Sequence, residues 1–214
     1  MEDVLDVYQR PFNPKRPTVC LDEGAKQLLD DSRPPEPMQA AQAERAAHPV
    51  REDYEYGREG MCSFFLVFAP LLCWRHVVVT ERRTALDFAH VIQYLVDVAF
   101  PDAEVIVLVL DNLNTHTTAS LYEAFEPAEA KRLADKLEIH YTPKHGSWLN
   151  MAEIELSVLG RQCLDRRLPN VGRLSSEIAA WEQARNTAKR TVHWHFTTAD
   201  ARIKLKKLYP IILP

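Results

Sequence analysis

Three acidic residues stand where a fold could use their carboxylates for chemistry. Asp22 follows a short apolar run at 18–21, and Asp111 follows a longer one at 105–110. Carboxylates at the C-terminal ends of strands are common functional groups in α/β folds. Glu153 lies just inside a predicted helix. Because carboxylate oxygen is the ligand that Mg²⁺ prefers, the three residues together indicate a site for divalent-metal and phosphate chemistry.

Phosphodiester chemistry explains why these residue types would be needed. It requires an activated oxygen nucleophile, neutralised charge at phosphorus and a stabilised leaving oxygen, and two Mg²⁺ ions roughly 3.5–4 Å apart supply all three. We therefore predict that Asp22, Asp111 and Glu153 are the catalytic residues and the ligands of two Mg²⁺ ions, with Mn²⁺ as a substitute. Their spacing is too long for a local motif, so only a fold can bring them together.

The apolar pattern predicts the elements that would do so. After an extended lead-in, strands are predicted at 18–21, 61–69, 74–80, 104–110 and 138–141. Helices are predicted at 84–100, 118–125, 128–136, 149–163, 175–189 and 198–208. Three strands that form an antiparallel meander, followed by two that add in parallel through helical crossovers, make an α/β fold with a ribonuclease-H-like mixed sheet flanked by helices. In that sheet Asp22 and Asp111 face each other, and the helix that carries Glu153 closes the site.

The length of 214 residues suits one domain. We divide it into an extended lead-in (1–17), a ribonuclease-H-like domain (18–190) and a basic C-terminal helix and tail (191–214). The net charge of −4 is unevenly distributed, because residues 154–214 hold 11 Lys and Arg against 5 Asp and Glu, whereas residues 1–153 hold 15 against 25. A basic C-terminal region is compatible with contacts to a nucleic-acid backbone, and equally with a solvated helical face.

Targeting signals are not evident. The longest apolar stretch, 64–72, is too short to cross a bilayer, and the acidic N-terminus is unlike a signal peptide. The four scattered cysteines form neither a zinc pair nor a disulfide framework. We expect a cytoplasmic protein without a membrane partner.

Four segments of this chain resemble one family. They are VCLDE at 19–23, WRHVVVTERRT at 74–84, LDNLNTH at 110–116 and YTPKHGSWLNMAE at 141–153. These strings are similar to the DDE transposases of bacterial insertion sequences, in the group related to mariner elements. In that family the three acidic residues match Asp22, Asp111 and Glu153. The resemblance implies a DDE catalytic domain that cuts DNA at transposon ends and joins them to a target.

The resemblance also implies partners. Full-length members carry N-terminal helix-turn-helix domains, and the similarity here covers the catalytic half alone. We expect an isolated domain, a split reading frame or a decayed copy. Its expected partners are DNA, as transposon ends and target, and a second copy or a partner chain that supplies helix-turn-helix domains.

Residues around the acidic motifs are candidate DNA contacts. They are Lys144, His145, Trp148, Arg82 and Arg83. The structural alternatives are a loop hydrogen bond for His145, a core position for Trp148, and solvated side chains for Arg82 and Arg83. Glu23 is expected on the opposite strand face with a structural role, His116 in a loop hydrogen bond, and Asn150 as the cap of the helix that carries Glu153.

Two other functions remain open from the sequence. A ribonuclease-H-like nuclease that hydrolyses without joining has the same element order, and only the motif strings favour a transposase. An inactive transposase remnant that binds DNA or a partner is the other. Strand transfer from a 3′-hydroxyl distinguishes a transposase from a hydrolytic nuclease. Metal-dependent nicking distinguishes an active enzyme from an inactive remnant.

Overall fold

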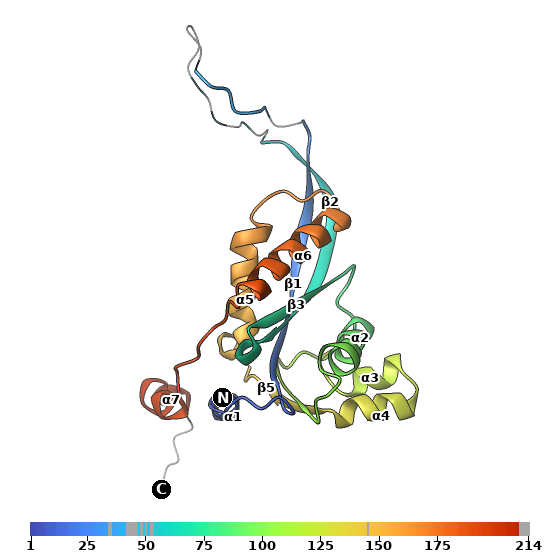
Figure 1. Ribbon diagram of the computed structural model, residues 1–214, viewed down its shortest axis with the longest axis vertical. Coiled ribbons are helices and arrows are strands. Elements are labelled where there is room, and N and C mark those ends of the chain that lie inside the picture. Colours follow the sequence, from blue (N-terminus) through green and yellow to red (C-terminus); the bar gives the residue numbers. More distant parts are fainter. Residues whose placement is uncertain are drawn as a thin grey trace.

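A five-stranded mixed sheet forms the centre of the fold, with the strand order β3-β2-β1-β4-β5 (Figure 1). The structure is a computed structural model and describes residues 1–33, 36–41, 47, 49, 51, 54–144 and 146–209. The strands are β1 (Thr18–Asp31), β2 (Tyr56–Ala69), β3 (Trp74–Thr80), β4 (Ile106–Leu110) and β5 (Leu137–Tyr141). β2 runs antiparallel to both β1 and β3, whereas β4 runs parallel to both β1 and β5. The predicted ribonuclease-H-like sheet is confirmed.

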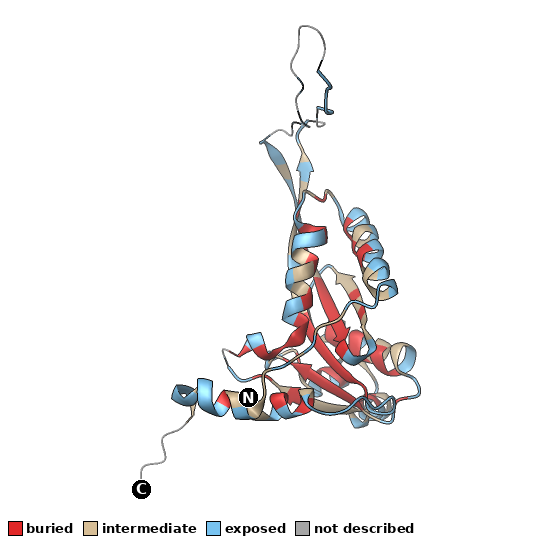
Figure 2. Ribbon diagram, turned by 60° about the vertical axis from the view of Figure 1, so that its left-hand side comes forward, coloured by how far each residue is buried: buried red, intermediate tan, exposed pale blue. Residues whose placement is uncertain are grey.

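Helices cover both faces of this sheet. They are α1 (Glu2–Tyr8), α2 (Ala85–Tyr94), α3 (Ala119–Ala124), α4 (Pro127–Asp135), α5 (Met151–Leu159), α6 (Val171–Thr187) and α7 (Thr198–Lys204). One apolar core joins the sheet to α1, α5, α6 and α7, and the other joins it to α2, α3 and α4. Figure 2 shows the buried strands between helices whose outer faces are exposed.

β4 contributes to both cores, which explains its composition. Val107 and Val109 belong to the core beneath α5, and Ile106, Leu108 and Leu110 belong to the core beneath α2. All five residues of the strand are buried. A continuous apolar run is what a parallel strand covered on both faces requires, so this prediction is confirmed.

The predicted extended lead-in is wrong over its first half, because residues Glu2–Tyr8 form α1. Val4, Leu5 and Val7 are buried in the core that contains α5. The three prolines that indicated extended chain all lie at 11–17, beyond the end of this helix. A seven-residue helix is marginal alone, so tertiary packing stabilises it.

The first two strands are longer than predicted. β1 continues past Asp22 to Asp31, and β2 begins at Tyr56 rather than 61, because the two strands pair with each other along this extension. Figure 1 shows them as a two-stranded ribbon that rises beyond the helices. Asp22 therefore lies within a strand, at the level where the neighbouring β4 ends.

The predicted helices are present with shifted ends. The predicted helix 84–100 is α-helical only to Tyr94 and then continues as a π-helical turn, Leu95–Ala99. Thr84 and Asp87 form a capping box at its start, as expected. α5 likewise passes into a π-helical turn, Gly160–Leu164. Among the described residues, no helix is long and apolar enough to cross a membrane.

Candidate active site

The strand register brings the first two acidic residues together. In the parallel pair of β1 and β4, Thr18, Val19 and Cys20 lie opposite Val107, Leu108 and Val109. Continuing this register by two residues places Asp22 opposite Asp111, immediately after the end of β4. The facing pair that the sequence predicted therefore follows from the sheet itself.

The helix that carries the third acidic residue is fixed at its start by an N-cap. Asn150 is the N-cap of α5, and its Oδ1 accepts a hydrogen bond from the backbone N–H of Ala152 at 3.1 Å. Its Nδ2 donates to the carbonyl of Leu21 at 2.8 Å and to Oδ2 of Asp22 at 3.3 Å. Glu153 lies in the first turn of α5 and is exposed. The cap thus fixes the start of α5 beside Asp22, as predicted for Asn150.

The electrostatics of Asp22 reflect a cluster of carboxylates. Only 9% of Asp22 is exposed, and burial raises the pKa of its carboxyl to about 7. A hydrogen bond from the backbone N–H of Glu23 lowers this pKa, whereas the negative charges of Glu153, Glu23 and Asp111 raise it. A carboxylate that neighbouring anions destabilise favours a cation or a proton. The oxygen donors of this cluster fit a divalent cation.

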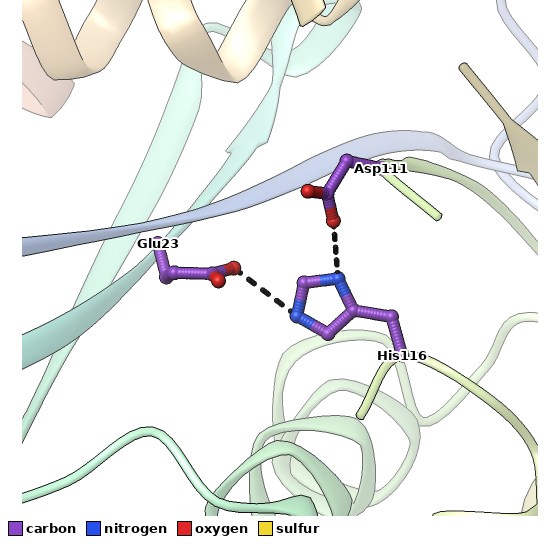
Figure 3. A group of neighbouring side chains, drawn as sticks. All are labelled: Glu23, Asp111 and His116. Atoms are coloured by element: carbon purple, nitrogen blue, oxygen red, sulfur yellow. Dashed lines mark hydrogen bonds and ion pairs between the residues drawn. The ribbon is translucent and has the colours of Figure 1, made fainter. Parts of the chain in front are cut away.

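A buried histidine links Asp111 to Glu23 (Figure 3). Nδ1 of His116 lies 2.6 Å from Oδ1 of Asp111, and Nε2 lies 3.1 Å from Oε2 of Glu23. The second contact is an ion pair rather than an aligned hydrogen bond. The His116 ring packs on Phe88 at 4.9 Å, and Tyr141 donates a hydrogen bond to its carbonyl at 2.8 Å. These contacts hold one oxygen of Asp111 in a fixed direction.

This trio of Glu23, Asp111 and His116 also has the composition of a metal site, with one ligand atom from each residue lying within 4.8 Å of the others. Its geometry favours an ion-pair chain, because each ring nitrogen faces a different carboxylate. Burial lowers the pKa of His116, but the hydrogen bond with Asp111 and the negative charges of Glu23 and Asp111 outweigh burial and raise the pKa to about 9. The imidazolium is itself the cation between the two acids.

A second buried charge cluster is centred on Glu155 of α5. Glu155 is fully buried and accepts hydrogen bonds from Arg185 on α6 at 2.7 and 3.1 Å. Nε of the fully buried Arg75, on β3, lies 3.1 Å from the same carboxylate. Asn186 bonds both the backbone and the guanidinium of Arg75. The cluster ties α5 to α6 and β3.

Of the predicted DNA contacts, Lys144 lies beside Asp111, and Trp148 is exposed nearby in the sequence. Lys144 is exposed and lines a cleft of about 310 Å³ together with Asp111, Asn112, Leu113, Thr142, Pro143 and Ser147. Trp148 is 45% exposed, and its ring meets Phe196 edge-on at 6.0 Å. It is therefore not the core residue that its position at a helix start made plausible.

The other predicted contacts lie apart from this cleft or outside the described residues. Arg83 pairs with Glu23 at 3.5 Å and is otherwise exposed. It therefore lies on the side of the sheet where Glu23 pairs with His116. Arg82 is exposed, and its carbonyl accepts a hydrogen bond from Thr80. His145 lies outside the described residues.

Sequence reasoning missed the connection of Glu23 and His116 to Asp111. Glu23 does lie on the opposite strand face from Asp22, yet its carboxylate meets the imidazole that holds Asp111. His116 does form a hydrogen bond in the loop, but its partner is the candidate catalytic carboxylate. The signal available was the histidine five residues after a strand-end aspartate.

The chain belongs to the DDE superfamily endonucleases, whose family model matches residues 17–175. Solved structures of the Mos1 mariner transposase share its fold. The Mos1 strand transfer complex aligns with a TM-score of 0.55 at 12% identity, over 85% of this chain and 51% of that chain. The Mos1 paired-end complex with the left transposon end has a TM-score of 0.55 at 14% identity, covering 85% and 52%.

A third Mos1 structure, a paired-end complex with Mn, has a TM-score of 0.54 at 13% identity, again over 85% of this chain and 52% of that one. The chain thus spans about half the length of the Mos1 chains that it matches. A search of curated proteins gave no match. The family model thus establishes the family, and the Mos1 structures establish the fold.

Proposed function

We propose that this chain is the catalytic domain of a DDE transposase, which cleaves DNA strands in a metal-dependent reaction and transfers them to a target. The observation that carries this proposal is the hydrogen bonding of Asn150, which caps the helix that carries Glu153 and donates to Asp22. The register of β1 and β4, continued to Asp22 and Asp111, and the negative charges of Glu153 and Asp111, which raise the pKa of Asp22, support a common site for the three carboxylates. The family membership and the fold of Mos1 transposase agree with it.

The donor set is suited to Mg²⁺ or Mn²⁺. Asp22, Asp111 and Glu153 would supply carboxylate oxygens and leave positions for water and phosphate. Two ions held in this way would activate the attacking oxygen and stabilise the leaving oxygen. The Mos1 structures that contain Mn or Mg are consistent with a divalent ion here.

The protein's own groups would prepare the site for DNA. Asn150 donates to Asp22 and so fixes one carboxylate, and His116 holds one oxygen of Asp111 and leaves the other free. Asp22, with a pKa of about 7, would release its proton when a cation binds. Lys144 would offer its ammonium group to a phosphate beside Asp111.

The two chemical steps use the same centre. In cleavage, water attacks a phosphodiester and frees a 3′-hydroxyl. In strand transfer, that hydroxyl attacks a target phosphodiester, so that one P–O bond forms as another breaks. The expected partners are transposon ends, target DNA, and a second copy or a chain that contributes DNA recognition.

The test is a cleavage and joining assay with labelled DNA ends and a preformed 3′-hydroxyl donor, in Mg²⁺ and in Mn²⁺. Asp111→Asn keeps the shape of the side chain but removes its charge, so cleavage should fall by roughly a thousandfold, because metal stabilisation contributes several kcal/mol. Asp102→Asn changes an exposed residue before the start of β4 and should leave activity unchanged.

The outcomes separate the three candidate functions. Joined products support a transposase, whereas cleavage without joining indicates a hydrolytic nuclease. Absence of any metal-dependent nicking indicates a remnant that binds DNA without chemistry. Equal nicking by Asp111→Asn and the parent protein would contradict the assignment of Asp111.

A further inference from the structure

The N-terminal helix α1 is anchored to several parts of the catalytic domain. Its apolar face is buried in the core beneath α5. Its polar side chains make four further links, Glu2 to Arg202 at 2.7 and 2.8 Å, Glu2 to Tyr209 at 2.9 Å, Asp3 to His140 at 2.7 Å, and Asp6 to Thr198 at 2.6 Å. A helix fixed at so many points can hold its last residue at a defined place.

That last residue is Tyr8, and its hydroxyl lies at the start of α5. Oη donates to the carbonyl of Leu149 at 2.7 Å and accepts from the backbone N–H of Met151 at 3.3 Å. These two backbone groups flank Asn150, the cap that bonds Asp22. The hydroxyl therefore bridges the chain immediately before and after the cap.

The surroundings of Tyr8 suit this bridge. Its ring meets Trp194 at 5.1 Å, and its hydroxyl lies 3.5 Å from the buried thiol of Cys20. Burial raises the pKa of Tyr8 well above its usual range, so the hydroxyl keeps its proton and can both donate and accept.

We propose that Tyr8 is a positioning residue for Glu153, because its hydroxyl fixes the direction in which α5 leaves the preceding turn. The first N–H groups of a helix lack partners within the helix, so an external acceptor at Met151 orders the first turn. Glu153 lies in that turn, and its own N–H bonds the carbonyl of Asn150 at 3.1 Å. This inference rests on the proposed function, in which Glu153 is a metal ligand.

The test compares Tyr8→Phe with the parent protein. The substitution removes one oxygen and keeps the ring against Trp194. Tyr209→Phe is the matched control, because it removes a hydroxyl that bonds α1 at Glu2 instead of the backbone at the start of α5. Two measurements are made on all three proteins: amide hydrogen exchange of Met151, Ala152 and Glu153, and DNA cleavage at saturating substrate in Mg²⁺ and in Mn²⁺.

Of the two backbone hydrogen bonds that Tyr8→Phe removes, the one from the N–H of Met151 orders this turn, and its loss should increase local opening about fivefold. We expect exchange in the first turn of α5 to accelerate by that factor in Tyr8→Phe and to stay unchanged in Tyr209→Phe. The kcat of cleavage in Mg²⁺ should fall about fivefold while the KM for DNA is unchanged. Mn²⁺ should reduce the defect, because it tolerates looser ligand geometry than Mg²⁺, which demands a near-ideal octahedron.

Each contrary result has one meaning. Unchanged exchange in the first turn of α5 would overturn the bridging role, whether or not DNA is cleaved. Faster exchange with unchanged kcat would make Tyr8 structural only and overturn the positioning role. If the parent protein itself shows no metal-dependent cleavage, the proposed function fails, and the positioning role fails with it.

Discussion

Nδ2 of Asn150 lies 3.3 Å from Oδ2 of Asp22 and 2.8 Å from the carbonyl oxygen of Leu21. One side chain thus joins the central strand to the helix that carries Glu153. The Asn150 amide therefore holds the first turn of this helix beside Asp22, although the two segments are far apart in the sequence. The proposed site therefore requires the hydrogen bonds of Asn150 as well as the carboxylates of Asp22 and Glu153.

Replacing Asn150 should damage both stability and cleavage. Asn150→Ala loses a helix cap and leaves the buried carbonyl of Leu21 without its donor, which together should cost about 2–4 kcal/mol of unfolding free energy. Urea denaturation measures the loss of unfolding free energy. Function is measured by DNA cleavage without urea, at a temperature well below the thermal unfolding transition. Asn170→Ala is the control, because Asn170 caps α6 in the same way but away from the site. Asn170→Ala should lose about 1 kcal/mol of unfolding free energy and should cleave DNA normally.

The His116 ion pair should make stability depend on pH. The pKa of His116 is raised from 6.5 to about 9 in the folded protein, so the stabilisation is fully present below pH 6.5 and is lost as pH rises through 9. Asp22, whose pKa in the folded protein is about 7, changes its ionisation mainly below pH 7.5. Between pH 7.5 and 9.5 the parent protein should therefore lose about 2 kcal/mol of unfolding free energy.

His116→Gln should remove most of that loss, because the titrating group is gone. His90→Gln, which alters an exposed histidine bonded to the carbonyl of Leu86, should keep it. Denaturant titrations at several pH values give the slopes. Parallel slopes for the parent and His116→Gln would contradict an imidazolium between Asp111 and Glu23.

The strands and the acidic pair followed from local apolar patterns. The strand 74–80 was predicted with its observed bounds, and β4 was recognised because burial on both faces leaves only apolar residues. Asp22 and Asp111 were selected because α/β folds commonly place functional carboxylates at the C-terminal ends of apolar strands. Their pairing needed only the strand order, which the sequence of strands and helices also predicted.

The missed features depend on contacts between distant residues. The second half of β1 is polar, and only its pairing with β2 makes it a strand. Glu155 is charged, so no pattern predicted its burial, which Arg75 and Arg185 make possible. Tyr8 stands before a proline-rich segment, and nothing local indicates that its hydroxyl reaches α5.

The buried charge cluster predicts a large loss of stability on truncation. Glu155→Ala leaves Arg75 and Arg185 without their shared carboxylate, and breaking a buried ion pair typically costs about 3–5 kcal/mol. Glu177→Ala removes a carboxylate on α6 that pairs with exposed Arg166 and Arg173, and should cost less than about 1 kcal/mol. Equal losses in urea denaturation would show that the Glu155 cluster adds nothing beyond a surface pair.

Lys144 should contribute charge rather than sequence recognition. If its ammonium contacts one DNA phosphate, Lys144→Gln should weaken binding to all sequences alike and reduce the slope of log K against log salt by about 1. Lys131→Gln is the control, because Lys131 is exposed but already paired with Asp135 on α4. Fluorescence anisotropy from low to moderate salt gives both slopes, and identical slopes for Lys144→Gln and the parent would remove Lys144 from the DNA interface.

The position of a bound Mn²⁺ ion tests the central claim most directly. Crystals grown with Mn²⁺ and a DNA end would locate it by anomalous diffraction. We expect the anomalous peak among the carboxylates of Asp22, Asp111 and Glu153, and its loss in Asp22→Asn. A peak on Glu23 and His116 instead, or one that persists unchanged in Asp22→Asn, would contradict the proposed catalytic centre.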